Sequence, residues 1–123
     1  MAAFTELELA ALHSLFSERP ELASKFEQQL SLARVVEREN TGAGFFTMIS
    51  VPADAPLINI SEPLSGETHA RIPGLEHELG FVLFVAGGRL NTLEGFAYGG
   101  STAELDLENV TFEIVKLPVN RGS

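Results

Sequence analysis

The sequence predicts an α+β fold in which an N-terminal two-helix hairpin packs on a curved, mainly antiparallel sheet of about six strands. Apolar residues recur at helical spacing only near the N-terminus, and β-prone runs separated by turn signals fill the rest of the chain. The strand-helix-strand alternation typical of parallel α/β folds is missing. A length of 123 residues fits a single domain, residues 1–123, that is large enough to bury a core.

The first helix is expected to run from Glu6 to near Ser17. Thr5 as N-cap and Glu8 three residues later form a capping box, the signature of a helix start. A second helix is expected to begin around Pro20, which a first helical turn tolerates because its missing N–H would have no helical partner there.

The pair Gly87-Gly88 marks a central hairpin, with strands expected at residues 80–86 and 89–96. Two glycines accept positive φ at both turn positions of a two-residue hairpin. If cross-strand partners step together from the turn, Phe81 faces Glu94. The incoming strand is apolar on both faces, so we expect it in the middle of the sheet with something packed on each side.

The remaining strands are expected wherever β-branched and aromatic residues alternate between turn signals. These segments are residues 32–39, 44–51, 57–60, 68–72 and 110–117.

The acidic composition of the chain disfavours some classes of binding partner. The chain has 17 acidic and 8 basic residues, a formal net charge of −9, and no cysteine. It therefore lacks the basic surface that binds phosphates, which disfavours nucleic acid and anionic membranes as partners. Its N-terminus has no signal-peptide pattern, and no apolar run approaches the ~18 residues of a membrane span. These features predict a cytoplasmic protein.

No chemical motif predicts a catalytic site, a cofactor or a metal. His69, Glu76, His77 and Glu78 form a His/carboxylate cluster, but their spacing matches no metal motif and a polar loop explains them equally well. A Ser/His/Asp triad is hard to assemble because the chain has only two Asp residues. The Gly-rich segments do not precede helices, so they are not expected to bind phosphate.

Glu94 is the most informative ionisable residue. In the inferred register its side chain shares an apolar face with Phe81, a setting that disfavours the charged carboxylate unless a cation such as Arg38 or Arg71 compensates. Glu94 is then either a pocket or acid/base carboxylate, or half of a buried Arg-Glu pair that fixes the sheet register. A third possibility is a β-bulge near Thr92 that turns Glu94 to solvent.

Two hairpin motifs follow one another in the chain. The first is Arg38-x-x-Thr41-Gly42-x-Gly44-Phe45-Phe46, and the second is Gly80-Phe81-x-Leu83-Phe84 followed by Leu93-Glu94-Gly95. This combination resembles a group of small bacterial proteins that share both motifs. The resemblance covers the region from Pro20 to Tyr98 and implies the fold and a bacterial origin, but it brings no activity, cofactor or catalytic residue.

Two functions remain open. The favoured one is a non-enzymatic accessory or protein-interaction module that binds an unknown protein, with a homodimer as an alternative. The other is a small-ligand binder or enzyme with a pocket between the helical hairpin and the sheet, using Glu94, Arg38 and His69. Arg71 is the further candidate for ligand binding.

Overall fold

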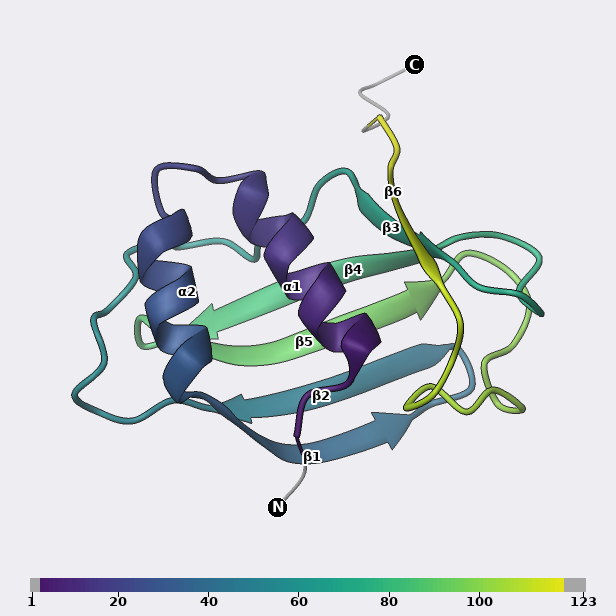
Figure 1. The fold of residues 1–123 in the computed structure, drawn as a ribbon, viewed down its shortest axis with the longest axis horizontal. Coiled ribbons are helices and arrows are strands. Elements are labelled where there is room, and N and C mark those ends of the chain that lie inside the picture. Colours follow the sequence, from purple (N-terminus) through teal and green to yellow (C-terminus); the bar gives the residue numbers. More distant parts are fainter. Residues whose placement is uncertain (1–2, 119–123) are drawn as a thin grey trace.

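The computed structural model describes residues 3–118, which form two helices and a six-stranded antiparallel sheet (Figure 1). This is the predicted α+β class. The strand order is β1-β2-β5-β4-β3-β6, and the sheet does not close into a barrel. The elements are α1 (Glu6–Ser17), α2 (Ala23–Leu32), β1 (Arg34–Asn40), β2 (Gly44–Ser50), β3 (Thr68–Arg71), β4 (Leu79–Ala86), β5 (Arg89–Ala97) and β6 (Glu113–Lys116).

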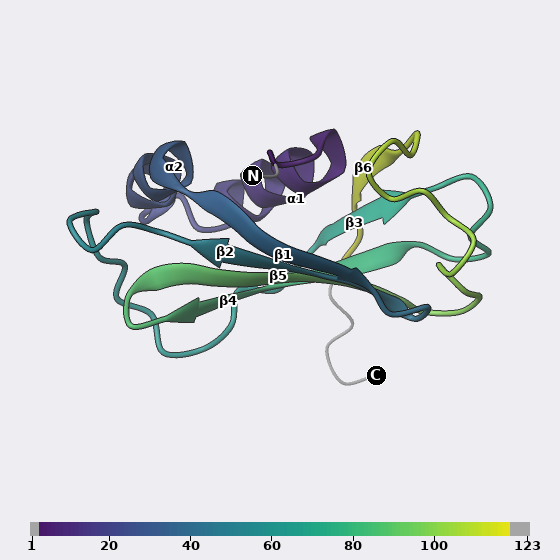
Figure 2. The same ribbon diagram turned by 90° about the horizontal axis from the view of Figure 1, so that it is seen from below.

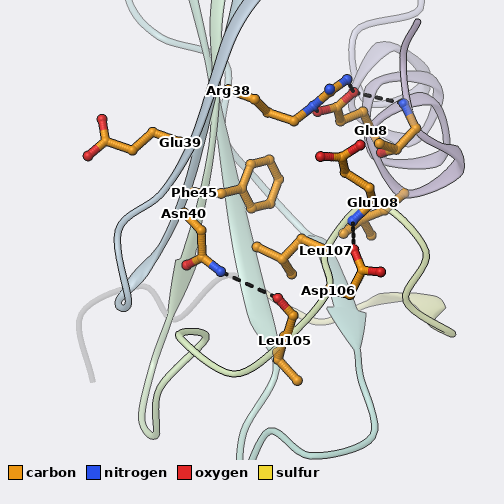
Figure 3. A pocket seen from close by; sticks show the side chains of 11 residues that line it. Glu8, Arg38, Glu39, Asn40, Phe45, Leu105, Asp106, Leu107 and Glu108 are labelled. Atoms are coloured by element: carbon orange, nitrogen blue, oxygen red, sulfur yellow. Dashed lines mark hydrogen bonds and ion pairs between the residues drawn. The ribbon is translucent and has the colours of Figure 1, made fainter. Parts of the chain in front are cut away.

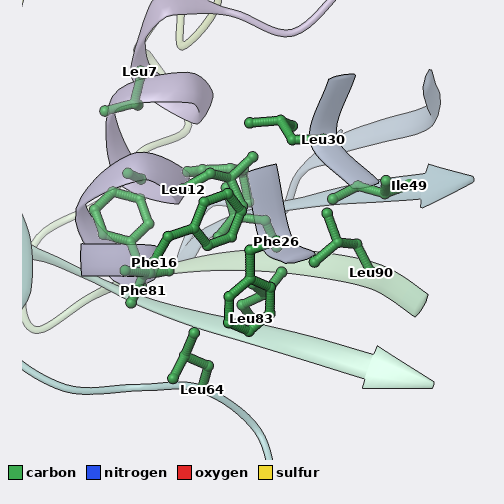
Figure 4. Packing of buried hydrophobic residues seen from close by; sticks show 14 of the residues in the cluster. Leu7, Leu12, Phe16, Phe26, Leu30, Ile49, Leu64, Phe81, Leu83 and Leu90 are labelled. Atoms are coloured by element: carbon green, nitrogen blue, oxygen red, sulfur yellow. The ribbon is translucent and has the colours of Figure 1, made fainter. Parts of the chain in front are cut away.

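Both helices lie on the same face of the twisted sheet (Figure 2). The core lies between these two layers, where Phe16 of α1 and Phe26 of α2 stack with ring centroids 4.7 Å apart (Figure 4). Leu83 and Leu93 point into this core from the two central strands and are fully buried. Burial of this apolar surface is the main source of stability for helices that would be marginal on their own.

The predicted start of α1 is confirmed. The Thr5 hydroxyl accepts a hydrogen bond from the Glu8 N–H at 3.0 Å, and the Thr5 N–H donates to Glu8 Oε1 at 2.8 Å. The predicted start of α2 is wrong by three residues, because Pro20 lies in the preceding turn and the helix begins at Ala23. The Pro20 carbonyl accepts from the Ala23 N–H at 3.4 Å, so the proline closes the turn between the helices.

The central hairpin is confirmed, since Gly87 and Gly88 have φ of 59° and 79°. Its incoming strand, β4, lies in the interior of the sheet as expected, between β5 and β3. Only its inner face is covered by helices, so the expectation that something packs on each side is wrong for the described residues.

The predicted register is correct only next to the turn. Val85 faces Leu90, but the next pair is Phe84 with Thr92, so Asn91 is an extra residue that forms a β-bulge. A slip of one residue turns every later side chain to the other face of the sheet. Glu94 therefore lies opposite Val82 and away from the helices.

Two predicted strands differ from the structure. Residues 57–60 form no strand, because the Ile58 N–H donates to the Gly88 carbonyl at 2.9 Å and so anchors the segment to a turn instead of a β-ladder. The last strand is limited to Glu113–Lys116 of the expected residues 110–117, and it pairs with β3.

Candidate functional site

A buried carboxylate connects α1 to the first two strands (Figure 3). The Glu8 side chain is 2% exposed, and Arg38 of β1 donates to both of its oxygens, from Nε at 2.6 Å and from Nη2 at 2.9 Å. Thr47 of β2 donates its hydroxyl to Glu8 Oε2 at 2.5 Å. With the capping bond from the Thr5 N–H, the carboxylate accepts four hydrogen bonds.

These bonds hold Glu8 in its charged form. Burial by itself raises the pKa of the Glu8 carboxyl, but the hydrogen bonds from Arg38, Thr47 and the Thr5 backbone outweigh burial and place that pKa below its usual value. A carboxylate that is ionised and saturated with donors has no free position for proton transfer. We therefore assign Glu8 a structural role.

A small cavity adjoins this ion pair. Its volume is about 180 Å³, and it lies between the start of α1, the end of β1 and residues 105–108. Ligand pockets commonly measure ~300–1,000 Å³, so this cavity is small even for a modest metabolite. The Asp106 carboxylate beside it already accepts from the Glu108 N–H at 3.3 Å and from Asn109 Nδ2 at 2.8 Å.

The four candidate residues from the sequence do not form one site. Of these, only Arg38 lines the small cavity. Arg71 lies near Glu78 and Glu113, with nitrogen–oxygen distances of 3.6 and 3.9 Å. Of the three alternatives for Glu94, the structure shows the β-bulge and not the Arg-Glu pair: the bulge at Asn91 turns Glu94 to the open side, and within residues 3–118 no cation pairs with it.

His69 is also held by hydrogen bonds. Its Nδ1 lies 2.8 Å from the Glu67 carbonyl oxygen, and its Nε2 lies 3.1 Å from the Tyr98 hydroxyl, whose ring stacks on the imidazole. A surface hollow beside His69 and Tyr98 is also lined by His77 and Glu78. In the described part of the chain, no three His, Asp or Glu side chains are placed to hold a metal ion.

Two glycines of the hairpin motifs, Gly44 of the first and Gly95 of the second, have a structural explanation. A Cβ on Gly44, whose φ is 146°, would lie 2.0 Å from the Gly95 carbonyl oxygen. A Cβ on Gly95 would lie 2.3 Å from the ring of Phe45. The two glycines thus permit the close approach of β2 and β5 and leave room for the ring of Phe45.

Sequence reasoning missed Gln29, whose side chain is completely buried. Its Nε2 donates to the carbonyls of Pro56 and Gly88 at 2.6 and 2.8 Å, and its Oε1 accepts from the Leu90 N–H at 2.9 Å. These hydrogen bonds connect α2 to the turn between β4 and β5 and to the loop that contains Pro56. Its only sequence signal is the spacing of three residues from Phe26, which places it on the inner face of α2, whereas its neighbours Glu27 and Gln28 are exposed.

The sheet face opposite the helices is the second candidate surface. We call it the open face and define it by the outward side chains of β1, β2, β5 and β4. Antiparallel pairing arranges them in two rows across the four strands, Glu39, Phe46, Glu94 and Val82 in one row and Glu37, Met48, Thr92 and Phe84 in the next.

Apolar side chains of the open face are accessible to solvent. Phe46 is 36% exposed and Met48 is 46% exposed, whereas Phe84 beside them is half-buried. These three residues, with Thr92 and the two glutamates of β1, line a hollow of about 350 Å³. The sequence did carry a signal for this surface, namely the apolarity of the central strand on both faces.

Within residues 3–118, the carboxylates of the open face have no side-chain partners. Glu37 and Glu39 lie on β1, opposite Met48 and Phe46 of β2. Glu94 lies on β5, between Phe46 of β2 and Val82 of β4. Over residues 3–118, none of these three glutamates forms an ion pair or accepts a side-chain hydrogen bond. The surface thus combines exposed apolar groups with uncompensated negative charge.

The chain matches no protein-family model, and no curated protein or solved structure is significantly similar to it. Among residues 3–118, no helix is long and apolar enough to cross a membrane.

Proposed function

We propose that this protein is a protein-interaction module that binds another protein through its open face. The supporting observation is the hollow between Phe46, Met48 and Phe84 on a sheet face that no helix covers. Contiguous exposed apolar surface rimmed by polar residues marks interaction sites on proteins. Aromatic residues and methionine are also enriched at protein interfaces.

The small-ligand or enzyme alternative receives less support. The cavity beside Arg38 is about 180 Å³, and the Glu8 carboxylate in its wall is saturated by four donors. The open hollow, at about 350 Å³, reaches the size of a ligand pocket, but among its lining residues there is no convergent acid, base or nucleophile beyond the glutamates. A broad apolar surface with peripheral charge suits a protein partner better than a metabolite.

The partner is a different protein and not a second copy of the chain. Two copies joined through the open face would bring the same unpaired glutamates together, and each copy carries a formal charge of −9. Like charges placed opposite one another disfavour such contacts. This charge also argues against nucleic acid as the partner.

Site-specific cross-linking in the native host tests this function. A photoreactive benzoylphenylalanine replaces Phe46 on the open face, and in a control chain it replaces Gln28, which is exposed on α2. We expect a defined cross-linked protein from position 46 only, and its loss when Met48→Thr is added. Threonine suits a β-strand but removes the apolar contact.

The proposal fails if positions 46 and 28 give the same products, if position 46 gives none, or if it cross-links only to another copy of the chain. Persistence of the product in the Met48→Thr background also contradicts it, because Met48 lines the hollow beside Phe46.

A further inference from the structure

The open face carries three unpaired carboxylates in a fixed pattern around its apolar centre. Glu37 and Glu39 flank Met48 and Phe46 on β1, and Glu94 lies on the other side of Phe46 on β5. Negative charge therefore stands on both sides of the exposed side chains of β2. A partner that covers this face must bring positive charge, or leave these carboxylates desolvated without compensation.

The face offers side chains and not backbone groups. Strand addition requires the unpaired N–H and C=O groups of a sheet edge, and of the four strands of the open face only β1 lies at an edge of the sheet. A strand added there would extend the sheet beside β1 and would not cover Phe46 and Met48 of β2.

The width of the face fits a single helix. Four strands with neighbours ~4.8 Å apart span about 14 Å, close to the ~10–12 Å diameter of an α-helix with its side chains. The protein's own helices cover the inner face of the same sheet. A partner helix on the open face would complete a three-layer arrangement.

We propose that the partner binds through a basic amphipathic α-helix that lies on the open face. This inference rests on the proposed function above. The apolar stripe of the helix enters the hollow between Phe46, Met48 and Phe84, with contacts repeating at the i, i+3, i+4 spacing of a helix in a groove. Lys or Arg residues that flank the stripe pair with the glutamates of β1 and with Glu94.

A synthetic helix provides the probe. It is an 18-residue peptide of Leu and Lys with helical periodicity, labelled for fluorescence anisotropy and mixed with the full chain. A peptide with Glu in place of every Lys is the control. We expect the Leu/Lys peptide to bind with an affinity that falls as salt rises, and the Leu/Glu peptide not to bind.

Matched charge reversals separate this face from the general acidity of the molecule. Glu37→Lys with Glu94→Lys removes two carboxylates of the open face, whereas Glu6→Lys with Glu27→Lys removes two exposed carboxylates of the helical layer. Both variants change the net charge equally. We expect the first to weaken binding about tenfold and the second to weaken it far less, because only the first pair lies at the contact.

Equal effects of the two variants, or failure of the Leu/Lys peptide to bind, would overturn the inference. If Glu37→Lys with Glu94→Lys lowers the urea midpoint, Glu37→Gln with Glu94→Gln replaces it and must still weaken binding more than Glu6→Gln with Glu27→Gln. Equal binding of the Leu/Glu peptide would also overturn it.

Phe46→Thr with Met48→Thr distinguishes failure of this inference from failure of the proposed function. If this variant loses the host partner while the charge variants behave alike, the partner is apolar but not basic. If it keeps the host partner and the peptide, the open face is not a docking surface and both proposals fail.

Discussion

Glu8 performs two structural tasks with one carboxylate. It completes the capping box of α1 and pairs with Arg38, which lies 30 positions later in the chain. The partial burial of Arg38, at 17% exposure, and the complete set of donors make this a pair whose disruption leaves an uncompensated charge. It fixes the start of α1 over β1 and β2.

Replacement of this carboxylate is expected to destabilise the protein strongly at neutral pH. Glu8→Gln leaves the Arg38 guanidinium without its counter-charge, and loss of one partner of a buried pair costs about 3–5 kcal/mol. Urea unfolding monitored by circular dichroism measures the difference. A change below about 0.5 kcal/mol, the usual range of surface substitutions, would contradict the structural role of Glu8.

The same pair predicts a pH dependence. The pKa of Glu8 is lowered in the folded state, so its contribution to stability is fully present above the usual pKa of about 4.5. That contribution is lost as the pH falls through the lower, folded-state value. The difference in unfolding free energy between wild type and Glu8→Gln should therefore shrink in acid, whereas a difference independent of pH would show that the charge of Glu8 is not involved.

Replacement of Glu94, unlike replacement of Glu8, should leave the stability of the protein almost unchanged. It has no ion-pair partner among residues 3–118 and lies on the open face, so Glu94→Gln should change the free energy of unfolding by less than about 0.5 kcal/mol. A loss of several kcal/mol would instead reveal a buried Arg-Glu pair. Denaturant midpoints of the two proteins at neutral pH give the answer.

Gln29 illustrates what a sequence reveals least, a polar side chain in an apolar core. Gln29→Leu keeps the size of the residue but leaves the Pro56 carbonyl and the Leu90 N–H without their partner, whereas the Gly88 carbonyl keeps its bond from the Ile58 N–H. An unsatisfied buried group costs about 1–3 kcal/mol, so we expect at least that loss in urea unfolding. An unchanged midpoint would mean that these backbone groups find other partners.

Elements with local signals were predictable from the sequence. The start of α1 followed from Thr5 and Glu8, and the central turn followed from Gly87-Gly88, because capping and positive φ depend on adjacent residues. The bulge at Asn91 has no such local signature, yet it decides which face Glu94 occupies.

The candidate sites depended on distant contacts and were harder to predict. Arg38 was expected, with Arg71 as the alternative, to supply a cation for Glu94, but the acid that it meets is Glu8 of α1. The relative placement of α1 and β1 decides this pairing. The apolarity of the central strand pointed to two covered faces, whereas only one is covered within residues 3–118.

The central turn offers a test at the scale of one element. A β-branched residue with positive φ is strongly strained, and a Cβ on Gly88 would also lie 3.0 Å from the Leu57 Cβ. The double variant Gly87→Val with Gly88→Val should be destabilised severely, and more than either single change to Asn, which tolerates positive φ. Thermal melts compare the double variant with the two single Asn variants. An unchanged melting temperature of the double variant would show that the fold does not need positive φ at Gly87 and Gly88.

At the scale of the whole molecule, the two faces of the sheet carry different side chains. The inner face carries the core and the saturated polar contacts of Glu8 and Gln29. The open face carries the accessible Phe46 and Met48 and the unpaired carboxylates. This difference between the two faces supports the proposal that the open face binds a partner.

The free energy of unfolding of Phe46→Thr with Met48→Thr, measured in urea without any partner, tests this proposal most directly. If the open face serves binding, the double variant should unfold at the same or a higher urea concentration than wild type, because exposed apolar groups at binding surfaces contribute little to folding. A loss of about 2–5 kcal/mol, the cost of truncating a core side chain, would show that the open face is part of the folded core and would contradict the account.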